Sequence, residues 1–384
     1  MSYTNLRSSW ILLFQFIILF AHADKKLTLP PAPELNESEI KKSIEKAEDF
    51  LIKNQNADGS WGTAGNTKEL NIYAPVPGAH RSFKTACTAL SLMGLLDAGT
   101  SASNKAKEKG LDWIIEHLPK VKRGSITTIY NVWTHCYAIE LLLKVKKKMK
   151  LSRSKRKAVD ELIDLQINYL KKYETIHGGW AYYNFGATTL RPNATGNSFT
   201  TASILLALLE AKSASFKVDK KIIERGKKVL QRQLNGDFSY IYNGTWKWRR
   251  AYYVNRAGGS LSRTQVCNLA LLKLGDKRIT KKITMEWLDK LIVKNGWLDQ
   301  GRKRPRPHES WFSVAGYYYY YGHYYASRNI LELTKENQSK YKKHLAQIII
   351  SKQEKDGSFW DFPLYNYHKF YGTGLALITL SNCL

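Results

Sequence analysis

The chain has 384 residues, more than a single compact core usually needs, so it holds either two domains or one architecture that grows by repetition. It carries 60 Lys and Arg against 32 Asp and Glu, a formal net charge of +28, which favours anionic partners or surfaces. No helix-turn-helix, zinc-finger or RNA-recognition signature accompanies the basic runs, so we expect solvated helix faces and no specific nucleic-acid site.

The first 23 residues have the pattern of an export signal. Arg7 gives a positive start, residues 10–20 form an apolar run, and "AHA" at 21–23 fits a cleavage site with small residues. This run is too short to span a bilayer, and no later stretch is long enough. We therefore expect a signal peptide at 1–23 and a short linker at 24–38, and a monomeric, secreted or periplasmic protein without a membrane span.

A turn in which Gly is closely followed by an aromatic residue recurs along the rest of the chain. The spacing is roughly 60 residues, or twice that between the first two copies, and a degenerate copy, "RGSI" at 123–126, lies in that longer gap. Six repeated units are therefore predicted. The aromatic residues of the turns are Trp61 ("DGSW"), Trp180 ("HGGW"), Phe238 ("GDF"), Trp297 ("NGW") and Phe359 ("DGSF").

Each unit is predicted to be a hairpin of two helices joined by this turn. In the first unit Ile40, Ile44, Ala47 and Leu51 recur at helical spacing among Lys and Glu, which is typical of an amphipathic outer helix. The helix after the turn is apolar on nearly all sides and should be buried. Inner helices are predicted near residues 83–97, 127–144, 198–212, 261–274, 310–330 and 367–382.

The chain stays apolar to its last residue, whereas an open helical solenoid needs a polar cap at each end. We therefore expect the sixth inner helix to pack against the first. Six closed hairpins give an all-α fold, an (α/α)6 toroid, as a single domain over residues 39–384.

These repeats resemble those of the terpenoid cyclase and protein prenyltransferase superfamily, whose fold is an α/α toroid. In its cyclases a Gln, a short spacer, Gly-Ser and an aromatic residue tie each outer helix to the next. Gln55 with Trp61 and Gln353 with Phe359 match this motif, and the resemblance covers essentially the whole mature chain. The aromatic residues Trp61, Trp180, Trp297 and Phe359 are accordingly expected to be buried at hairpin joints, away from the cavity.

The catalytic signatures of the superfamily are incomplete in this sequence. The D-x-D-D motif with which its cyclases protonate their substrate is absent. Its protein prenyltransferases hold zinc with an Asp and a Cys two residues apart and with a His. The stretch "HESWFS" at 308–313 resembles the first segment without those two ligands, and His368 matches the His. The resemblance thus leaves zinc as a lesser alternative to an unmetalled acid/base cluster of His308, Glu309 and His368.

The loops that join each outer helix to the next inner helix emerge at one end of the toroid, where the inner-helix N-termini favour an anion. In the fifth inner helix, Tyr317 and His323 belong to a tyrosine-rich stretch that indicates a polar, aromatic-lined cavity. Further candidate ligand contacts in or beside these loops are Trp246, Trp248, Arg249, Arg250, Arg256 and Arg263.

Two functions remain open. The first is an exported toroid protein that binds or acts on an anionic ligand, either isoprenoid-like or an anionic polysaccharide, by cyclase-, transferase- or lyase-like chemistry. The second is a non-catalytic binding or scaffold protein that kept the toroid and lost the chemistry. A deep cavity with convergent His, Glu and Arg would favour the enzyme, and a filled barrel would favour the scaffold.

Overall fold

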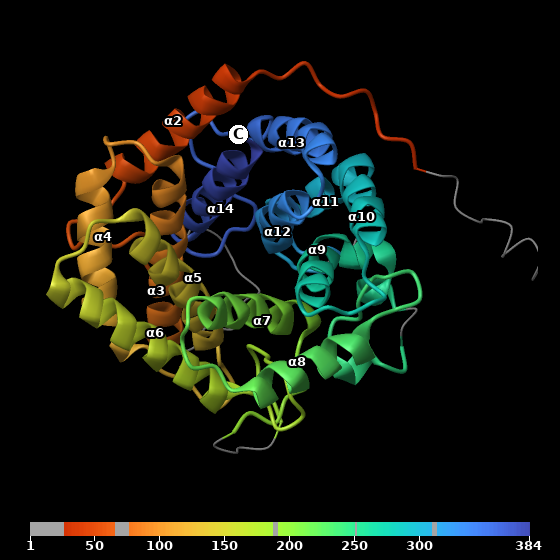
Figure 1. The fold of residues 1–384 in the computed structure, drawn as a ribbon, viewed down its shortest axis with the longest axis horizontal. Coiled ribbons are helices and arrows are strands. Elements are labelled where there is room, and N and C mark those ends of the chain that lie inside the picture. Colours follow the sequence, from red (N-terminus) through yellow and green to blue (C-terminus); the bar gives the residue numbers. More distant parts are fainter. Residues whose placement is uncertain (1–26, 66–76, 187–190, 250–251, 309–312) are drawn as a thin grey trace, which may run out of the picture.

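A computed structural model describes residues 27–65, 77–186, 191–249, 252–308 and 313–384. Within these ranges the regular secondary structure is helical, and β-pairing is limited to isolated bridges such as Thr63 with Asn366. The twelve principal helices of the described residues form two concentric rings, with one outer and one inner helix in each hairpin (Figure 1). No helix in the described part of the chain is long and apolar enough to cross a membrane.

The outer helices carry an apolar face towards the inner ring and a charged face towards solvent. In α2, Ile40, Ile44, Ala47 and Leu51 are buried, and Asn36 with Glu39 forms a capping box at its N-terminus. The outer helices are α2 (Glu37–Lys53), α4 (Asn104–His117), α6 (Arg153–Tyr173), α8 (Lys220–Gln233), α10 (Lys281–Val293) and α13 (Lys335–Ile350).

The inner helices are buried on most sides, as their composition predicts. They are α3 (Pro77–Ala98), α5 (Asn131–Lys148), α7 (Ser198–Ser213), α9 (Ala257–Lys273), α12 (Tyr319–Leu331) and α14 (His368–Cys383). Shorter elements lie in the connections: η1 (Leu118–Lys120), η2 (Gly244–Trp246), η3 (Tyr253–Asn255), α11 (Asn295–Gly301) and η5 (Gly316–Tyr318).

The inner ring is closed, which confirms the predicted toroid. Each inner helix contacts the next, and α14 packs against α3 (Figure 1). Gly94 of α3 and Gly374 of α14 allow this close approach, because a Cβ atom on Gly374 would lie 2.4 Å from the carbonyl oxygen of Leu90. The four cysteines are free and buried within the helical layers.

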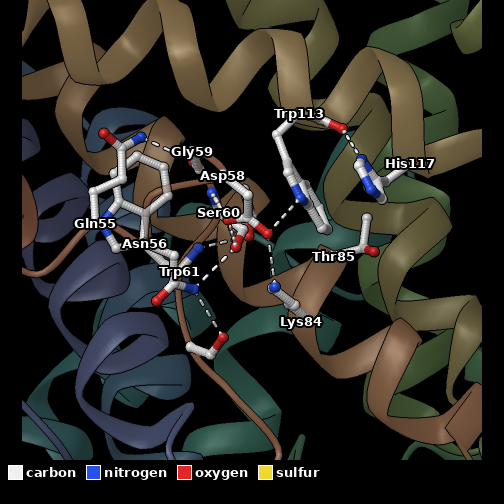
Figure 2. Close-up of polar contacts among 12 residues, drawn as sticks. Gln55, Asn56, Asp58, Gly59, Ser60, Trp61, Lys84, Thr85, Trp113 and His117 are labelled. Atoms are coloured by element: carbon white, nitrogen blue, oxygen red, sulfur yellow. Dashed lines mark hydrogen bonds and ion pairs between the residues drawn. The ribbon is translucent and has the colours of Figure 1, made fainter.

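The turn after α2 explains how the repeats are held together (Figure 2). The amide of Gln55 donates to the carbonyl oxygens of Gly59, at 2.8 Å, and of Ala106 on the next outer helix, at 2.9 Å. Trp61 is fully buried; its indole N–H donates to Leu51 O at 2.8 Å, and its backbone N–H to Thr88 Oγ1 at 3.1 Å.

Two other turns repeat this arrangement. The indole N–H of Trp180 donates to the carbonyl oxygen of Leu170, and the amide of Gln353 donates to Ser43 O on α2, which joins the last outer helix to the first. Trp61, Trp180 and Phe359 are each 0% exposed, so these three aromatic residues fasten the hairpin joints as predicted.

In the turn after α8, the buried aromatic residue lies two positions later than the Gly-aromatic pattern indicates. Asp237 accepts from the backbone and hydroxyl of Ser239, as Asp58 does from Ser60, so the aromatic residue of this turn is Tyr240 and not Phe238. Tyr240 is fully buried. Phe238 instead takes the position of Gly59 and has a left-handed φ of 64°.

The fifth unit departs furthest from the sequence prediction. Its turn forms the short helix α11, which carries a partly buried Trp297 where a largely buried residue was expected. The inner helix begins at Tyr319 and not near residue 310. Gly316 packs tightly on the carbonyl oxygen of Asp361, where a Cβ would lie 2.5 Å away, and Ala315 before it is extended.

Candidate functional site

A cavity of about 340 Å³ lies within the inner ring at the end where the inner helices begin. Residues of α3, α5, α7, α12 and α14, mostly from the N-terminal halves of these helices, form its wall together with η5 and the connecting loops. Most of these side chains are aromatic, with Ala, Leu, Pro, Cys and one His among the rest. The described lining contains no carboxylate and no Lys or Arg, so the polar side-chain groups of this mainly aromatic wall are chiefly tyrosine hydroxyls and the imidazole of His308.

His308 is the titratable base of this lining. Its backbone φ of 56° is left-handed, and its Nδ1–H donates to the carbonyl oxygen of Ser313 at 2.8 Å. Because a carbonyl can only accept, this bond fixes the proton on Nδ1 and leaves Nε2 as an acceptor, 3.4 Å from the hydroxyl of Tyr317. Burial, with a contribution from Arg263, lowers the pKa of His308 to about 4, so the ring is neutral near pH 7.

Tyrosine hydroxyls are the other polar groups of the wall. Tyr182 and Tyr242 share a hydrogen bond between their hydroxyls. The hydroxyl of Tyr318 is buried and has no hydrogen-bond partner among the described residues. Burial raises the pKa of Tyr182, Tyr242 and Tyr318 above the ordinary value, so all three hydroxyls keep their protons.

Arg263 lies behind this wall and not in it. Its side chain is 0% exposed, and its guanidinium carbon lies 5.4 Å from the ring centroids of both Tyr242 and Tyr318. It donates to the carbonyl oxygens of Gly259 and Val254. The lining therefore shows tyrosine rings where an arginine was expected, with the cation one layer deeper.

The other basic and aromatic candidates of the 242–259 loop lie outside the described lining. Arg249 and Arg256 are exposed, and Trp248 is 85% exposed. Arg250 and the side chain of Trp246 lie outside the part of the structure that is described. A ligand-binding role for these residues stays a prediction.

The structure places the remaining histidines apart from this polar group. His368 does not line the cavity; its Nδ1–H donates to Tyr365 O at 2.6 Å, and its ring packs on Trp360 at 5.1 Å. His323 is buried behind the wall, with Nδ1 2.7 Å from Tyr319 O and Nε2 2.7 Å from Asn295 Nδ2. Glu309 lies outside the described residues.

These positions do not fit the zinc site of the prenyltransferases. In the described part of the chain, no three His, Cys, Asp or Glu side chains converge closely enough to hold a metal ion. His308 already uses Nδ1 for Ser313, and His368 is directed to its own loop. We therefore assign no step to a metal.

One buried carboxyl group lies just behind the cavity wall. Asp361 is 0% exposed and accepts from the hydroxyl of Tyr371, a lining residue, at 2.6 Å and from the backbone N–H of Tyr320 at 3.0 Å. Burial raises its pKa to about 7 in spite of these bonds. Sequence patterns did not single out Asp361, since an isolated Asp in a loop carries no spacing signal.

The loop tyrosines of the cavity were also missed, although a signal for two of them exists. Tyr182 and Tyr242 each lie two residues after a buried turn aromatic, Trp180 and Tyr240. In an extended segment, side chains two residues apart lie on the same side of the chain. The residue two positions after each turn aromatic was therefore a candidate for the interior of the barrel.

Comparisons with known proteins agree with this architecture. The family model of the squalene-hopene cyclase C-terminal domain matches residues 28–127. The type II terpene cyclase MstE from Scytonema is 13% identical, with a TM-score of 0.51 over 90% of this chain and 98% of that chain. The α-1,6-mannanase GH76A of Salegentibacter sp. HEL1_6 is 11% identical, with a TM-score of 0.51 over 90% and 98% of the two chains.

A possible member of the GH105 family from Salmonella enterica serovar Paratyphi A is 12% identical, with a TM-score of 0.52 over 93% of this chain and 97% of that chain. No curated protein matches the sequence. The fold is an α/α toroid like those of the terpene cyclase and of the mannanase. At these identities the similarity establishes the toroid, and the choice of ligand depends on the cavity itself.

Proposed function

We propose that this terpenoid cyclase-like toroid binds an isoprenoid-like ligand in its central cavity. The observation that carries the proposal is the described lining, which is aromatic and aliphatic apart from tyrosine hydroxyls and His308. Its volume of about 340 Å³ falls in the range of small-molecule sites. Burying apolar ligand surface there contributes about 25 cal/mol per Å².

The two kinds of neighbour bind different ligands, and the cavity favours one of them. A structure of MstE contains geranylgeranyl dihydroxybenzoate, and a structure of the mannanase contains α-1,6-mannotetrose. The inactive mannanase variants have two aspartates replaced, and glycoside hydrolases generally use a pair of carboxylates. The described lining here offers no such pair, so a prenyl chain fits it better than an oligosaccharide.

The polar groups of the lining can bind a ligand, and His308 is the group among them that could act as a base. His308 keeps Nε2 as an acceptor, 3.4 Å from the hydroxyl of Tyr317, and burial lowers its pKa to about 4, so the neutral ring can accept a hydrogen bond from a ligand but is a weak base. A cyclase-like reaction would also need a proton donor. The binding role, the alternative to catalysis that the sequence left open, is therefore the one we propose.

We also propose that the protein acts outside the cytoplasm, because of the export signal at residues 1–23, which lies outside the described residues. Expression of the full chain in a secreting host and N-terminal sequencing of the product test this. Recovery of a product that starts near Asp24 supports export, and an intact N-terminus in the cytoplasmic fraction contradicts it.

Calorimetric titration tests the ligand proposal. We expect farnesol to bind the purified protein and α-1,6-mannotetrose to give no heat. Ala86 lines the cavity, so Ala86→Phe should fill part of it and weaken farnesol binding by about ten-fold or more. Leu331, 43% exposed near the opposite end of α12, provides the control Leu331→Phe. Binding of the sugar alone, or equal farnesol affinity in both variants, would refute the proposal.

A further inference from the structure

We propose that the polar end of the cavity recognises a carboxylate, so that the ligand is an isoprenoid-like carboxylic acid whose head group meets Tyr242 and Tyr318 in front of Arg263. This inference rests on the proposed binding of an isoprenoid-like chain and names its head group. It depends on a buried cation, on an unused hydroxyl and on their position at the cavity wall.

The first observation is the buried charge of Arg263. A buried guanidinium is costly unless it is paired, and its usual partner is a carboxylate. Within the described residues no carboxylate lies in ion-pair distance of Arg263, which is 0% exposed. Two backbone carbonyl oxygens accept from its Nη atoms, and its Nε has no partner in the described residues. Its positive charge is therefore not neutralised by a neighbouring side chain.

The second observation is the direction in which this charge acts. The guanidinium lies 5.4 Å from the ring centroids of both Tyr242 and Tyr318, and the same two tyrosines line the cavity. A cation in a medium of low dielectric acts over this range with little screening. The positive potential of Arg263 thus acts at the cavity wall, although the described lining contains no arginine.

The third observation is the supply of hydrogen-bond donors at that wall. Tyr318 is 2% exposed, and its hydroxyl makes no hydrogen bond of normal geometry within the described residues, although it interacts electrostatically with the nearby hydroxyls of Tyr242 and Tyr317. In the bonded pair of Tyr182 and Tyr242 only one hydroxyl proton is used, so the other can be donated. An acceptor with two oxygens would satisfy both donors.

A negatively charged acceptor suits this arrangement better than a neutral one. Hydrogen bonds to a carboxylate are about twice as strong as those between neutral groups, and a neutral alcohol would leave the charge of Arg263 unbalanced. His308 is neutral, and its Nε2 acceptor lies 3.4 Å from the hydroxyl of Tyr317, so it does not use the donors of Tyr242 and Tyr318. The remaining wall is apolar and holds the chain.

The test compares three ligands that share one chain: farnesoic acid, its methyl ester and farnesol, titrated calorimetrically at pH 7.5. We expect the acid to bind about ten-fold or more tightly than the ester, which is the range for hydrogen bonds to charged groups. In Tyr318→Phe, which removes only the unpaired hydroxyl, affinity for the acid should fall about ten-fold while the ester is unaffected. Arg263→Met should remove the preference, but its loss of two backbone contacts can also impair folding, so Tyr318→Phe is the decisive variant.

The matched control is Tyr341→Phe on α13, which removes a hydroxyl bonded to Asp289 on the outer ring. It should leave the acid-to-ester ratio unchanged. Equal affinity for acid and ester, or a preference for the acid that survives Tyr318→Phe, would overturn the carboxylate inference while leaving chain binding intact. Failure of all three ligands to bind would overturn both.

Discussion

Glu140 and Arg328 come from opposite sides of the inner ring, and their side chains meet across it, with Glu140 Oε1 2.9 Å from Arg328 Nη1. The hydroxyl of Tyr324 donates to the other carboxylate oxygen at 3.1 Å, and Arg328 also pairs with Glu210 of α7. These contacts join α5, α7 and α12 near the end of the barrel opposite the aromatic cavity. They close the ring interior, which gives the cavity a floor.

Breaking the pair of Glu140 and Arg328 should greatly lower the free energy of unfolding. Arg328→Met leaves the buried carboxylate of Glu140 without its cation, and removal of one partner of a buried pair costs about 3–5 kcal/mol. Lys53→Met breaks a pair with Asp49 whose side chains are 73% and 63% exposed, and should cost less than about 1 kcal/mol. Urea unfolding followed by circular dichroism measures both. Similar small losses in the two variants would show that the cross-ring pair does not stabilise the fold.

The buried acid Asp361 predicts how stability varies with pH. Its folded pKa is raised to about 7 by burial, against about 3.9 in an unfolded chain, so between these values the folded protein holds a proton that the unfolded chain has lost. The contribution of this group is therefore fully present below about pH 4 and is lost as the pH rises to about 7. The slope is at most about 1.4 kcal/mol per pH unit.

Asp361→Asn imitates the protonated group and should remove the part of the decline that Asp361 contributes, while Glu140, whose pKa burial also raises to about 7, contributes the same slope in both proteins. Urea unfolding at pH 5, 6 and 7 compares the variant with the parent, which cancels the opposite slope that His308 contributes between about pH 4 and 6.5. Asp49→Asn, on the exposed face of α2, is the control and should keep the slope of the parent protein. If Asp361→Asn also keeps it, the carboxyl group is ionised in the folded state.

The repeat of roughly 60 residues and the apolar spacing within it were sufficient to predict the two rings of helices, but not the residues that form each turn. Burial acts on a whole helix and leaves a regular apolar spacing, so all six inner helices were predicted, although the fifth begins at Tyr319 and not near residue 310. The register of one turn depended on a single hydrogen-bonded Asp-x-Ser unit, and a Gly-aromatic pattern could not distinguish Phe238 from Tyr240.

The candidate site was harder to predict, because its geometry depends on contacts between units. His308 reaches the cavity through a left-handed backbone that no spacing indicates. His368 directly follows the lining residue Tyr367, but its ring packs on Trp360 and not in the cavity wall. Arg263 was identified by charge and position, but its place behind two tyrosines follows from packing alone.

The turn aromatics predict stability effects without binding effects. Trp61→Ala removes a fully buried ring and its bond to Leu51 O, and should cost about 3 kcal/mol or more while farnesol affinity stays unchanged. Trp248→Ala, at an 85% exposed site, is the control and should cost almost nothing. Loss of farnesol binding in a folded Trp61→Ala protein would contradict the fastening role.

The same measurement settles the register of the turn after α8. Tyr240→Ala should cost about 3 kcal/mol, because Tyr240 is fully buried and its hydroxyl donates to Asn268 Oδ1 at 2.9 Å. Phe238→Gly should cost less than about 1 kcal/mol, since a φ of 64° favours Gly and offsets part of the lost packing. A larger loss for Phe238→Gly would restore Phe238 as the fastening residue.

The closure of the ring predicts that Gly374 tolerates no side chain. A Cβ there would lie 2.4 Å from Leu90 O and 2.9 Å from Ser91 N, both backbone atoms of α3, so α14 and α3 would have to separate. Gly374→Ala should therefore cost about 1–3 kcal/mol, the usual range for overpacking. Gly296, in α11, has no atom within 4 Å of a Cβ position, and Gly296→Ala should be neutral or stabilising by up to about 1 kcal/mol. Thermal unfolding of the two variants compares the same added methyl group at both places. Equal melting temperatures would mean that α3 and α14 can move apart without loss, and that the first and last units do not form a tight joint.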